Sequence, residues 1–293
     1  MKKTWICVEV PCPSEIADEI AAEVAVAFGV GVEITDTGVR FYLEGDCFKQ
    51  KWSNTLRKLF SDYEKSAGLN SPFTYTYNAI ADGDWADRWK EGFKPLRVGR
   101  HFVVSPTWEE VDAGPEDLVI LIDPGRAFGT GHHETTRLCL EWLEERVSVR
   151  PDVGACSLLD VGTGSGILAM AAALLGFANV LGIDNDPEAI EVADENVRLN
   201  GLEGKVQLRL DTVSGRDRFE VVVANIQANP LIGMAGRLAK ILEPSGHLVL
   251  SGILVEQKEQ VKTAYAAEGL QQIDERTAGE WCLLAFERAS EVA

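Results

Sequence analysis

Apolar and polar positions alternate along the first 80 residues in a strand, helix, strand, strand, helix, strand order. A period of two predicts a strand, and apolar residues three or four positions apart predict a helix. This order of elements is that of a ferredoxin-like α+β module. The predicted strands cover residues 4–10, 30–35, 39–44 and 73–80, and the two helices have the apolar faces Ile16, Ile20, Val24 and Phe28, and Leu56, Leu59, Phe60 and Tyr63.

Residues 82–94 predict a short polar helix that connects this module to the rest of the chain. Trp85 and Trp89 lie four positions apart on it, and Pro95 follows. We interpret the two tryptophans as interface or core residues. The predicted domains are therefore a small module at 1–80, a linker at 81–95 and a larger domain at 96–293.

From about residue 96 the pattern changes to strands that alternate with helices, which is typical of a parallel α/β sheet. We predict a Rossmann-like domain with seven strands, the last two forming an antiparallel pair. Helices are predicted to begin near Ser165, Asp186, Pro230 and Val255. The predicted strands are 157–161, 180–184, 206–210, 221–225 and 248–251, followed by the pair near 271–274 and 281–286.

Composition and charge narrow the classes of function. The formal net charge of -18 and the lack of a Lys/Arg-rich stripe argue against direct binding of nucleic acid, whereas that charge favours encounter with a basic protein. The six cysteines include no C-x-x-C pair, so neither a zinc site nor a disulfide framework is predicted. No apolar run approaches the roughly 20 residues that cross a membrane, and no apolar signal segment precedes the first strand, so we expect a cytoplasmic protein.

A glycine-rich loop follows the first strand of the larger domain, in the sequence LLDVGTGSGILAMAAALLG at 158–176. Its glycines allow the backbone to turn sharply and to approach a ligand closely at the carboxyl end of a strand. The G-x-G-x-G spacing differs from the G-x-G-x-x-G dinucleotide fingerprint, which places a pyrophosphate at a helix N-terminus. Asp160 before the loop would repel a pyrophosphate, but it is compatible with the sulfonium cation of S-adenosylmethionine.

The next strand ends in Asp184, whose carboxylate can accept hydrogen bonds from both hydroxyls of a ribose. An acid at this position also fits NAD, so a dehydrogenase is the alternative. Together with the glycine spacing, it favours a methyltransferase that uses S-adenosylmethionine. The predicted cofactor-binding residues of this region are Asp160, Gly162, Gly164 and Asp184.

The fourth strand is followed by the sequence NIQANPL at 225–231. Methyltransferases that act on planar amide or base nitrogens carry N-P-P-[YF] or D-P-P-[YF] here, and the aromatic ring stacks on the target. This chain has no aromatic residue at that place, so we expect an aliphatic amine as the methyl acceptor. Asn225 is predicted to bind the cofactor or to orient the acceptor amine, with helix capping as its alternative role.

Several segments together carry a family resemblance. They are DPGRAFGTGHHETTRLCLEWL at 123–143, the glycine loop, NIQANPL, LSGIL at 250–254, and W-x-x-x-W-K-x-x-F-K-P at 85–95. With them the chain resembles the PrmA-type methyltransferases, which modify ribosomal protein L11 of the large subunit. The resemblance covers essentially the whole chain.

The resemblance implies that the N-terminal module recognises the ribosomal protein and that the linker helix lets it pivot. The C-terminal domain would then methylate lysine side chains and the α-amino group with S-adenosylmethionine. It also implies a loop at 129–131 over the methionine end of the cofactor. The chain departs from the family pattern at His132, Glu134 and Gln227. The cofactor contacts implied by matching positions are Thr136, Gly162, Asp184 and Asn225, with Thr130 and Gly131 in the covering loop.

Methyl transfer from a sulfonium is an in-line displacement, so the protein must supply alignment and a neutral nitrogen lone pair. Desolvation beside the sulfonium cation would lower the pKa of a lysine amine, so we nominate no dedicated general base and expect no metal. His132 and His133 are the nearest candidates for a base, and we interpret them as residues that shape the loop. Two other classes stay open, namely a non-catalytic binding or assembly factor for a basic ribosomal protein and a small-molecule amine methyltransferase.

Overall fold

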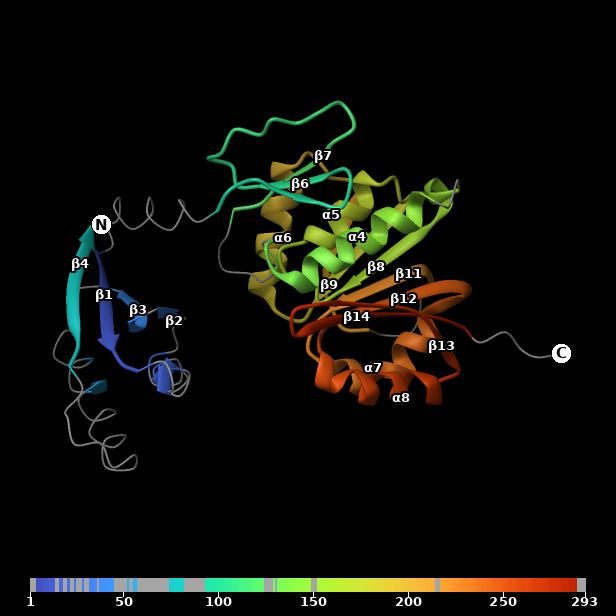
Figure 1. Ribbon diagram of the computed structural model, residues 1–293. Helices are drawn as coiled ribbons and strands as arrows, with labels where there is room; N and C mark the ends of the chain where they lie inside the picture. The colour runs from blue at the N-terminus through green and yellow to red at the C-terminus, as the bar shows by residue number, and fades with distance from the viewer. Residues whose placement is uncertain are drawn as a thin grey trace. The chain divides into compact units, whose positions relative to one another are not determined.

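The chain forms two compact units, Met1–Gly92 and Phe93–Ala293, in the computed structural model (Figure 1). The boundary falls inside the segment predicted as a linker. Residues 82–92 of the helix predicted there, with Trp85 and Trp89, lie outside the described residues, and Phe93 and Lys94 are not helical. Within the described part, no helix has the length and apolarity needed to cross a membrane. The structure describes residues 4–13, 16, 17, 20, 21, 24, 28, 32–35, 37–44, 52, 55, 56, 74–81, 93–123, 129, 131–148, 152–213 and 217–288.

The N-terminal unit contains a four-stranded antiparallel sheet with the order β2-β3-β1-β4. Alternate residues of the central strands, including Val8 and Phe41, are buried on one face, as the period-two pattern predicts. The described residues from 16 to 28 are helical, and Ile20 and Val24 among them are buried in the same core. The strands are β1 (Thr4–Pro11), β2 (Val32–Thr35), β3 (Gly38–Glu44) and β4 (Thr76–Ala81).

The second unit is built on a mixed seven-stranded sheet with the order β10-β9-β8-β11-β12-β14-β13. The first five strands in this order are parallel, and β14 runs antiparallel to both of its neighbours. All seven predicted strands are present. They are β8 (Ser157–Val161), β9 (Asn179–Asp184), β10 (Val206–Leu210), β11 (Phe219–Asn225), β12 (Leu242–Leu254), β13 (Leu270–Ala278) and β14 (Trp281–Arg288).

Helices cover both faces of this sheet (Figure 1). Because side chains alternate across a strand, Val221 and Val223 of β11 pack with α4 and α5, whereas Val222 and Ala224 pack with α7 and α8. Both faces are therefore buried, and the central strands are mostly apolar, as parallel strands usually are. The helices are α4 (Glu134–Ser148), α5 (Ile167–Leu174), α6 (Pro187–Leu199), α7 (Ala228–Ile241) and α8 (Lys258–Ala267), with 3-10 turns at Val153–Ala155 and Val255–Gln257.

The helices predicted near Pro230 and Val255 are present: α7 begins at Ala228, and the 3-10 turn that starts at Val255 leads into α8. Two details differ from the sequence prediction. The strand expected at 248–251 is longer, because β12 continues past the carboxyl edge of β11 to pair with β14. A second, three-stranded sheet of β5 (Leu96–Val98), β6 (Phe102–Ser105) and β7 (Leu118–Leu121) and the helix α4 were not predicted. Strands of three or four residues are too short to show a clear period.

Candidate active site

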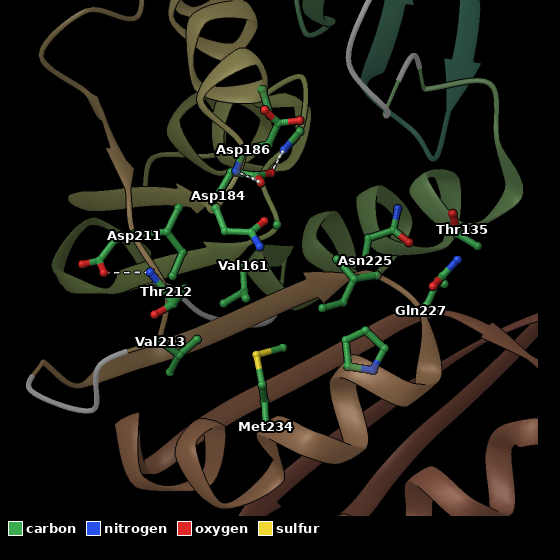
Figure 2. Close-up of a pocket in the computed structure, with 18 of the residues that line it drawn as sticks. Thr135, Val161, Asp184, Asp186, Asp211, Thr212, Val213, Asn225, Gln227 and Met234 are labelled. Atoms are coloured by element: carbon green, nitrogen blue, oxygen red, sulfur yellow. Dashed lines mark hydrogen bonds between the residues drawn. The ribbon is translucent and has the colours of Figure 1, made fainter. Parts of the chain in front are cut away.

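A cavity of about 700 Å³ lies at the carboxyl ends of β8, β9, β10 and β11. Open α/β sheets bind ligands at this edge, where the connections out of successive strands diverge. Figure 2 shows carboxylates of Asp184, Asp186 and Asp211 gathered at one end of the cavity and the amides of Asn225 and Gln227 at the other. The cavity therefore has one acidic end and one end whose described lining carries no carboxylate.

The glycine loop forms the floor between these two ends. Gly162 has φ of +71°, and a Cβ atom built there would lie 2.5 Å from Cγ2 of Ile226, at the end of β11. The amides of Gly162 and Thr163 both donate to the carbonyl of Ile183, at 2.9 and 3.0 Å, which ties the loop to the end of β9. Only glycine combines this backbone conformation with so close an approach.

Asp160 lies behind the loop and is 1% exposed. Its Oδ2 accepts hydrogen bonds from Oγ1 of Thr163 at 2.7 Å and from the amide of Ala169 at 3.2 Å. Burial raises the pKa of this carboxyl group to about 7. The structure thus places Asp160 as an anchor of the loop and the start of α5, and it is not among the residues that line the cavity. The cofactor contact predicted for Asp160 stays a prediction.

Asp184 lies at the acidic end, where its side chain faces the cavity (Figure 2). Its Oδ2 accepts from the amide of Gly164 at 3.0 Å, and its Oδ1 accepts from the amide of Asp186 at 3.1 Å. Each oxygen of a carboxylate can accept more than one hydrogen bond, so both oxygens can also accept from ligand hydroxyls. Asp186 in turn accepts from the amide of Glu188 at 2.9 Å and caps α6.

The acidic end contains a further group that the sequence patterns did not nominate. Asp211, Thr212 and Val213 follow β10 and line the cavity, and Oδ1 of Asp211 accepts from the amide of Thr212 at 2.7 Å. The amide of Asp211 donates to the carbonyl of Asp184 at 2.9 Å, so the ends of β9 and β10 are held together. An acidic residue directly after the third parallel strand was the available signal. Apolar lining residues here are Ile183, Ala189, Val213 and Met234.

Two residues distant in sequence meet at the other end. Nδ2 of Asn225 donates to Oγ1 of Thr136 at 3.2 Å, and Thr136 is fully buried in α4. Oδ1 of Asn225 is buried and has no hydrogen-bond partner among the described residues. A buried amide oxygen of this kind needs a donor, so it fits a site for a ligand N–H.

The glycine-rich segment before α4 lies against the glycine loop where it is described. The carbonyl of Gly129 accepts from Oγ of Ser165 at 2.6 Å. Gly131 has φ of +82°, and a Cβ atom there would lie 2.8 Å from Cγ1 of Val104. Thr130, a predicted cofactor contact, lies outside the described residues.

The two histidines of this segment have different surroundings. Nδ1 of His133 accepts from the amide of Thr135 at 3.3 Å and lies 2.8 Å from its Oγ1. The ring of His132 packs edge-on against Phe93. His133 lines the cavity, whereas His132 is not among the lining residues. Because Nδ1 of His133 is held by the start of α4, its position agrees with a residue that shapes the loop.

Comparison with known proteins gives one consistent group. The family model of ribosomal protein L11 methyltransferase (PrmA) matches residues 4–289. The ribosomal protein L11 methyltransferase of Pelobacter propionicus is 38% identical over 99% of both chains, and that of Geobacter sulfurreducens is 41% identical over 98% of this chain and 99% of its own. The crystal structure of ribosomal protein L11 methylase from Lactobacillus delbrueckii subsp. bulgaricus matches with a TM-score of 0.62 and 34% identity, over 68% of this chain and all of that one.

Proposed function

Because this chain belongs to the PrmA family of ribosomal protein L11 methyltransferases, we propose that it methylates lysine side chains and the α-amino group of ribosomal protein L11. It is a methyltransferase that depends on S-adenosylmethionine. The observation that carries the choice of acceptor is the cavity with one acidic end and one end whose described lining has no carboxylate. The acidic end suits a nucleoside, and the other end suits a neutral amine beside the sulfonium.

The described residues fit this cofactor. Asp184 would accept hydrogen bonds from the ribose hydroxyls, and the apolar side chains of Ile183 and Met234 would flank the adenine. Asp211 and the backbone of Val213 offer an acceptor and an N–H donor for the polar edge of the base. Gly162, which has no space for a side chain, would let the methionine part approach the loop.

Bound S-adenosylmethionine supplies an electrophilic methyl group on a cationic sulfur. We assign to Oδ1 of Asn225 the role of accepting an N–H of the amine, which aims the nitrogen lone pair into the cavity. Thr136 holds the Asn225 amide in this orientation by accepting from Nδ2. Positioning of this kind is the main contribution an enzyme makes to a displacement between two bound groups. The amine proton would leave through water.

The N-terminal unit would recognise the ribosomal protein. We propose a ferredoxin-like fold for residues 1–80, because the order β2-β3-β1-β4 and the helical residues between β1 and β2 agree with it. A linker at 81–95 would connect it to the methyltransferase domain at 96–293. The net charge of -18 complements a basic ribosomal protein. A cytoplasmic location, where ribosomal proteins are made, fits the same function.

The test uses the full chain, purified unmethylated ribosomal protein L11 and S-adenosylmethionine with a labelled methyl group. We expect label in ribosomal protein L11, located by mass spectrometry on lysines and the terminal amine. Asn225→Ala should keep cofactor binding within a few fold and reduce transfer by about a hundredfold, since orientation of a reacting group is typically worth this much.

The control is the same reaction with small aliphatic amines in place of the protein. Cofactor binding without label transfer to ribosomal protein L11 would favour a non-catalytic assembly factor. Faster transfer to the small amines than to the protein would favour a small-molecule methyltransferase.

A further inference from the structure

An aromatic pair lies in the lining of the cavity outside its acidic end. Trp281 is the first residue of β14, and His133 immediately precedes α4. Their ring centroids are 5.0 Å apart, with an angle of 66° between the ring planes. Both residues line the cavity.

A continuous set of contacts connects this pair to Asn225. Asn225 pairs with Ser251 across β11 and β12, and Oγ of Ser251 donates to the carbonyl of Thr135 at 3.2 Å. The amide of Thr135 donates to Nδ1 of His133, and the imidazole ring of His133 packs against the indole of Trp281. Trp281 itself pairs with Leu254 of β12. The aromatic pair therefore belongs to the acceptor end of the cavity.

The hydrogen bond at Nδ1 also determines which tautomer a neutral imidazole adopts here. A backbone amide can only donate, so Nδ1 accepts and the ring proton of neutral His133 lies on Nε2. The carboxylates of the described lining belong to Asp184, Asp186 and Asp211, all at the opposite end (Figure 2). The described acceptor end is thus lined by an imidazole, an indole and amide groups, without a carboxylate.

Successive methylation changes what an amine can bind. A primary amine has N–H groups for Oδ1 of Asn225, but each added methyl replaces one of them, and a neutral dimethylated (tertiary) amine has none. Aromatic rings need no N–H, because they attract methyl groups by dispersion and the cationic methylammonium by their quadrupole. A site that relied on Asn225 alone would therefore hold its substrate less well after every transfer.

We propose that Trp281 and His133 form the acceptor-side wall on which an already methylated nitrogen packs, and that this wall sets how many methyl groups one nitrogen receives. The proposal rests on the proposed function and adds to it a determinant of product state. Trp281 and His133 are positioning residues in this account. The amine that enters is primary, and the same nitrogen returns as the secondary and then the tertiary acceptor.

Each round is balanced in atoms and electrons. The nitrogen lone pair forms the new N–C bond while the C–S bond breaks, and the electron pair of that bond stays on sulfur as a neutral thioether. The nitrogen becomes an ammonium with one more methyl group. It must lose a proton to water before the next round. After the third transfer it has no proton to lose and stays a cation.

The test measures the rates of the first and third methylations on unmethylated ribosomal protein L11 by mass spectrometry over time. In Trp281→Leu the ratio of the third rate to the first should fall about tenfold, the usual scale for loss of one aromatic contact to a methylated ammonium. Trp281→Phe should restore most of this ratio because it keeps a ring. Trp108→Leu makes the same chemical change outside the cavity lining and should leave the ratio unchanged.

A second variant keeps the test valid if Trp281→Leu does not fold. In His133→Asn the side-chain oxygen can still accept from the Thr135 amide, so the start of α4 keeps its cap while the ring is lost. We expect the same decrease in the ratio. The proposal is wrong if the folded variants keep the ratio of the third rate to the first, or if all three methylation rates fall by the same factor. Absence of transfer by the unmodified protein would instead refute the proposed function.

Discussion

The carboxylate of Asp160 is the buried acid on which the glycine loop depends. Its Oδ2 accepts from both Thr163 and Ala169, and burial raises its pKa from 3.8 to about 7. A group with a raised pKa in the folded state binds its proton more tightly there than in the unfolded chain. Its contribution to stability is fully present below about pH 4 and is lost as the pH rises through about 7.

The first prediction concerns this pH dependence. Between about pH 4 and 7, Asp160 should decrease the free energy of unfolding of the second unit by at most about 1.4 kcal/mol per pH unit. Asp160→Asn should remove this slope, because an amide does not titrate while its Oδ1 can still accept both hydrogen bonds. Urea unfolding of both proteins at a series of pH values measures the difference. Parallel pH profiles would show that Asp160 does not titrate in this range.

The second prediction concerns the space at Gly162. Gly162→Ala should weaken S-adenosylmethionine binding more than tenfold, because the new Cβ would lie 2.5 Å from Ile226 and the φ of +71° is unfavourable for alanine. Gly204 has φ of +81° with nothing within 4 Å of a built Cβ, so Gly204→Ala carries the backbone cost alone. Gly204→Ala should therefore leave the affinity for S-adenosylmethionine unchanged, as measured by isothermal titration calorimetry.

A double mutant separates the two causes at Gly162. Ile226→Ala removes the atom that the new Cβ would meet, so it should recover part of the affinity lost in Gly162→Ala. The coupling is read from a double-mutant cycle, since Ile226 itself lines the cavity. Additive losses in the cycle would mean that the contact with Ile226 is not the cause.

At the level of elements, a single side chain connects the small three-stranded sheet to helix α6. Oδ1 of Asn200, which ends α6, accepts from the amide of Leu121 at 2.8 Å. Nδ2 of the same residue donates to the carbonyl of Leu121, also at 2.8 Å. The amide group thus pairs with β7 as a neighbouring strand would. β7 leads into the segment at 123–143 that ends in α4.

The third prediction follows from this connection. Asn200→Ala should destabilise the second unit by about 2–3 kcal/mol, because it leaves a donor and an acceptor of the Leu121 backbone without partners. Protection of the Leu121 amide against hydrogen exchange should fall further than that of the central strands. Asn179→Ala, an exposed asparagine at the start of β9, serves as the matched control and should change neither quantity. Equal protection of Leu121 in both variants would contradict this role.

For the whole molecule, the dominant property is its charge of -18. Attraction between an acidic enzyme and a basic protein substrate acts over distances comparable to the Debye length, about 8 Å at physiological salt. It mainly raises the association rate.

The fourth prediction is therefore a salt dependence of substrate capture. kcat/KM for ribosomal protein L11 should fall about tenfold or more between 50 and 500 mM NaCl, with most of the change in KM, because screening slows encounter. The affinity for S-adenosylmethionine, whose recognition is local, should change by less than about threefold over the same range. A kcat/KM that is independent of salt would indicate an uncharged contact surface.

Much of this protein could be predicted from its sequence, because many of the signals are local. The strands of the large sheet follow from apolar runs and, in β10 and β13, from alternating positions. The cofactor follows from the spacing of Gly162, Gly164 and Gly166 with Asp184. A glycine that must adopt a positive φ and an acid at a strand end are visible within a few positions of the chain. The family resemblance depends on the same short segments.

The arrangement of the site depends on tertiary structure. Strand order decides which ends become neighbours, so hydrogen-bond partners such as Thr136 and Asn225 can lie 89 positions apart. It also decides orientation: Asp160 faces a buried threonine behind the loop, whereas Asp211 lines the cavity.

The methyltransferase class was thus determined by the sequence itself, because backbone conformation at a glycine loop is a local property. The composition of the acceptor end was decided only by packing. His133 and Trp281 come from opposite ends of the domain sequence, and β14 brings them together by inserting antiparallel beside β12. A period or a spacing along the chain carries no information about which distant side chains will share a cavity.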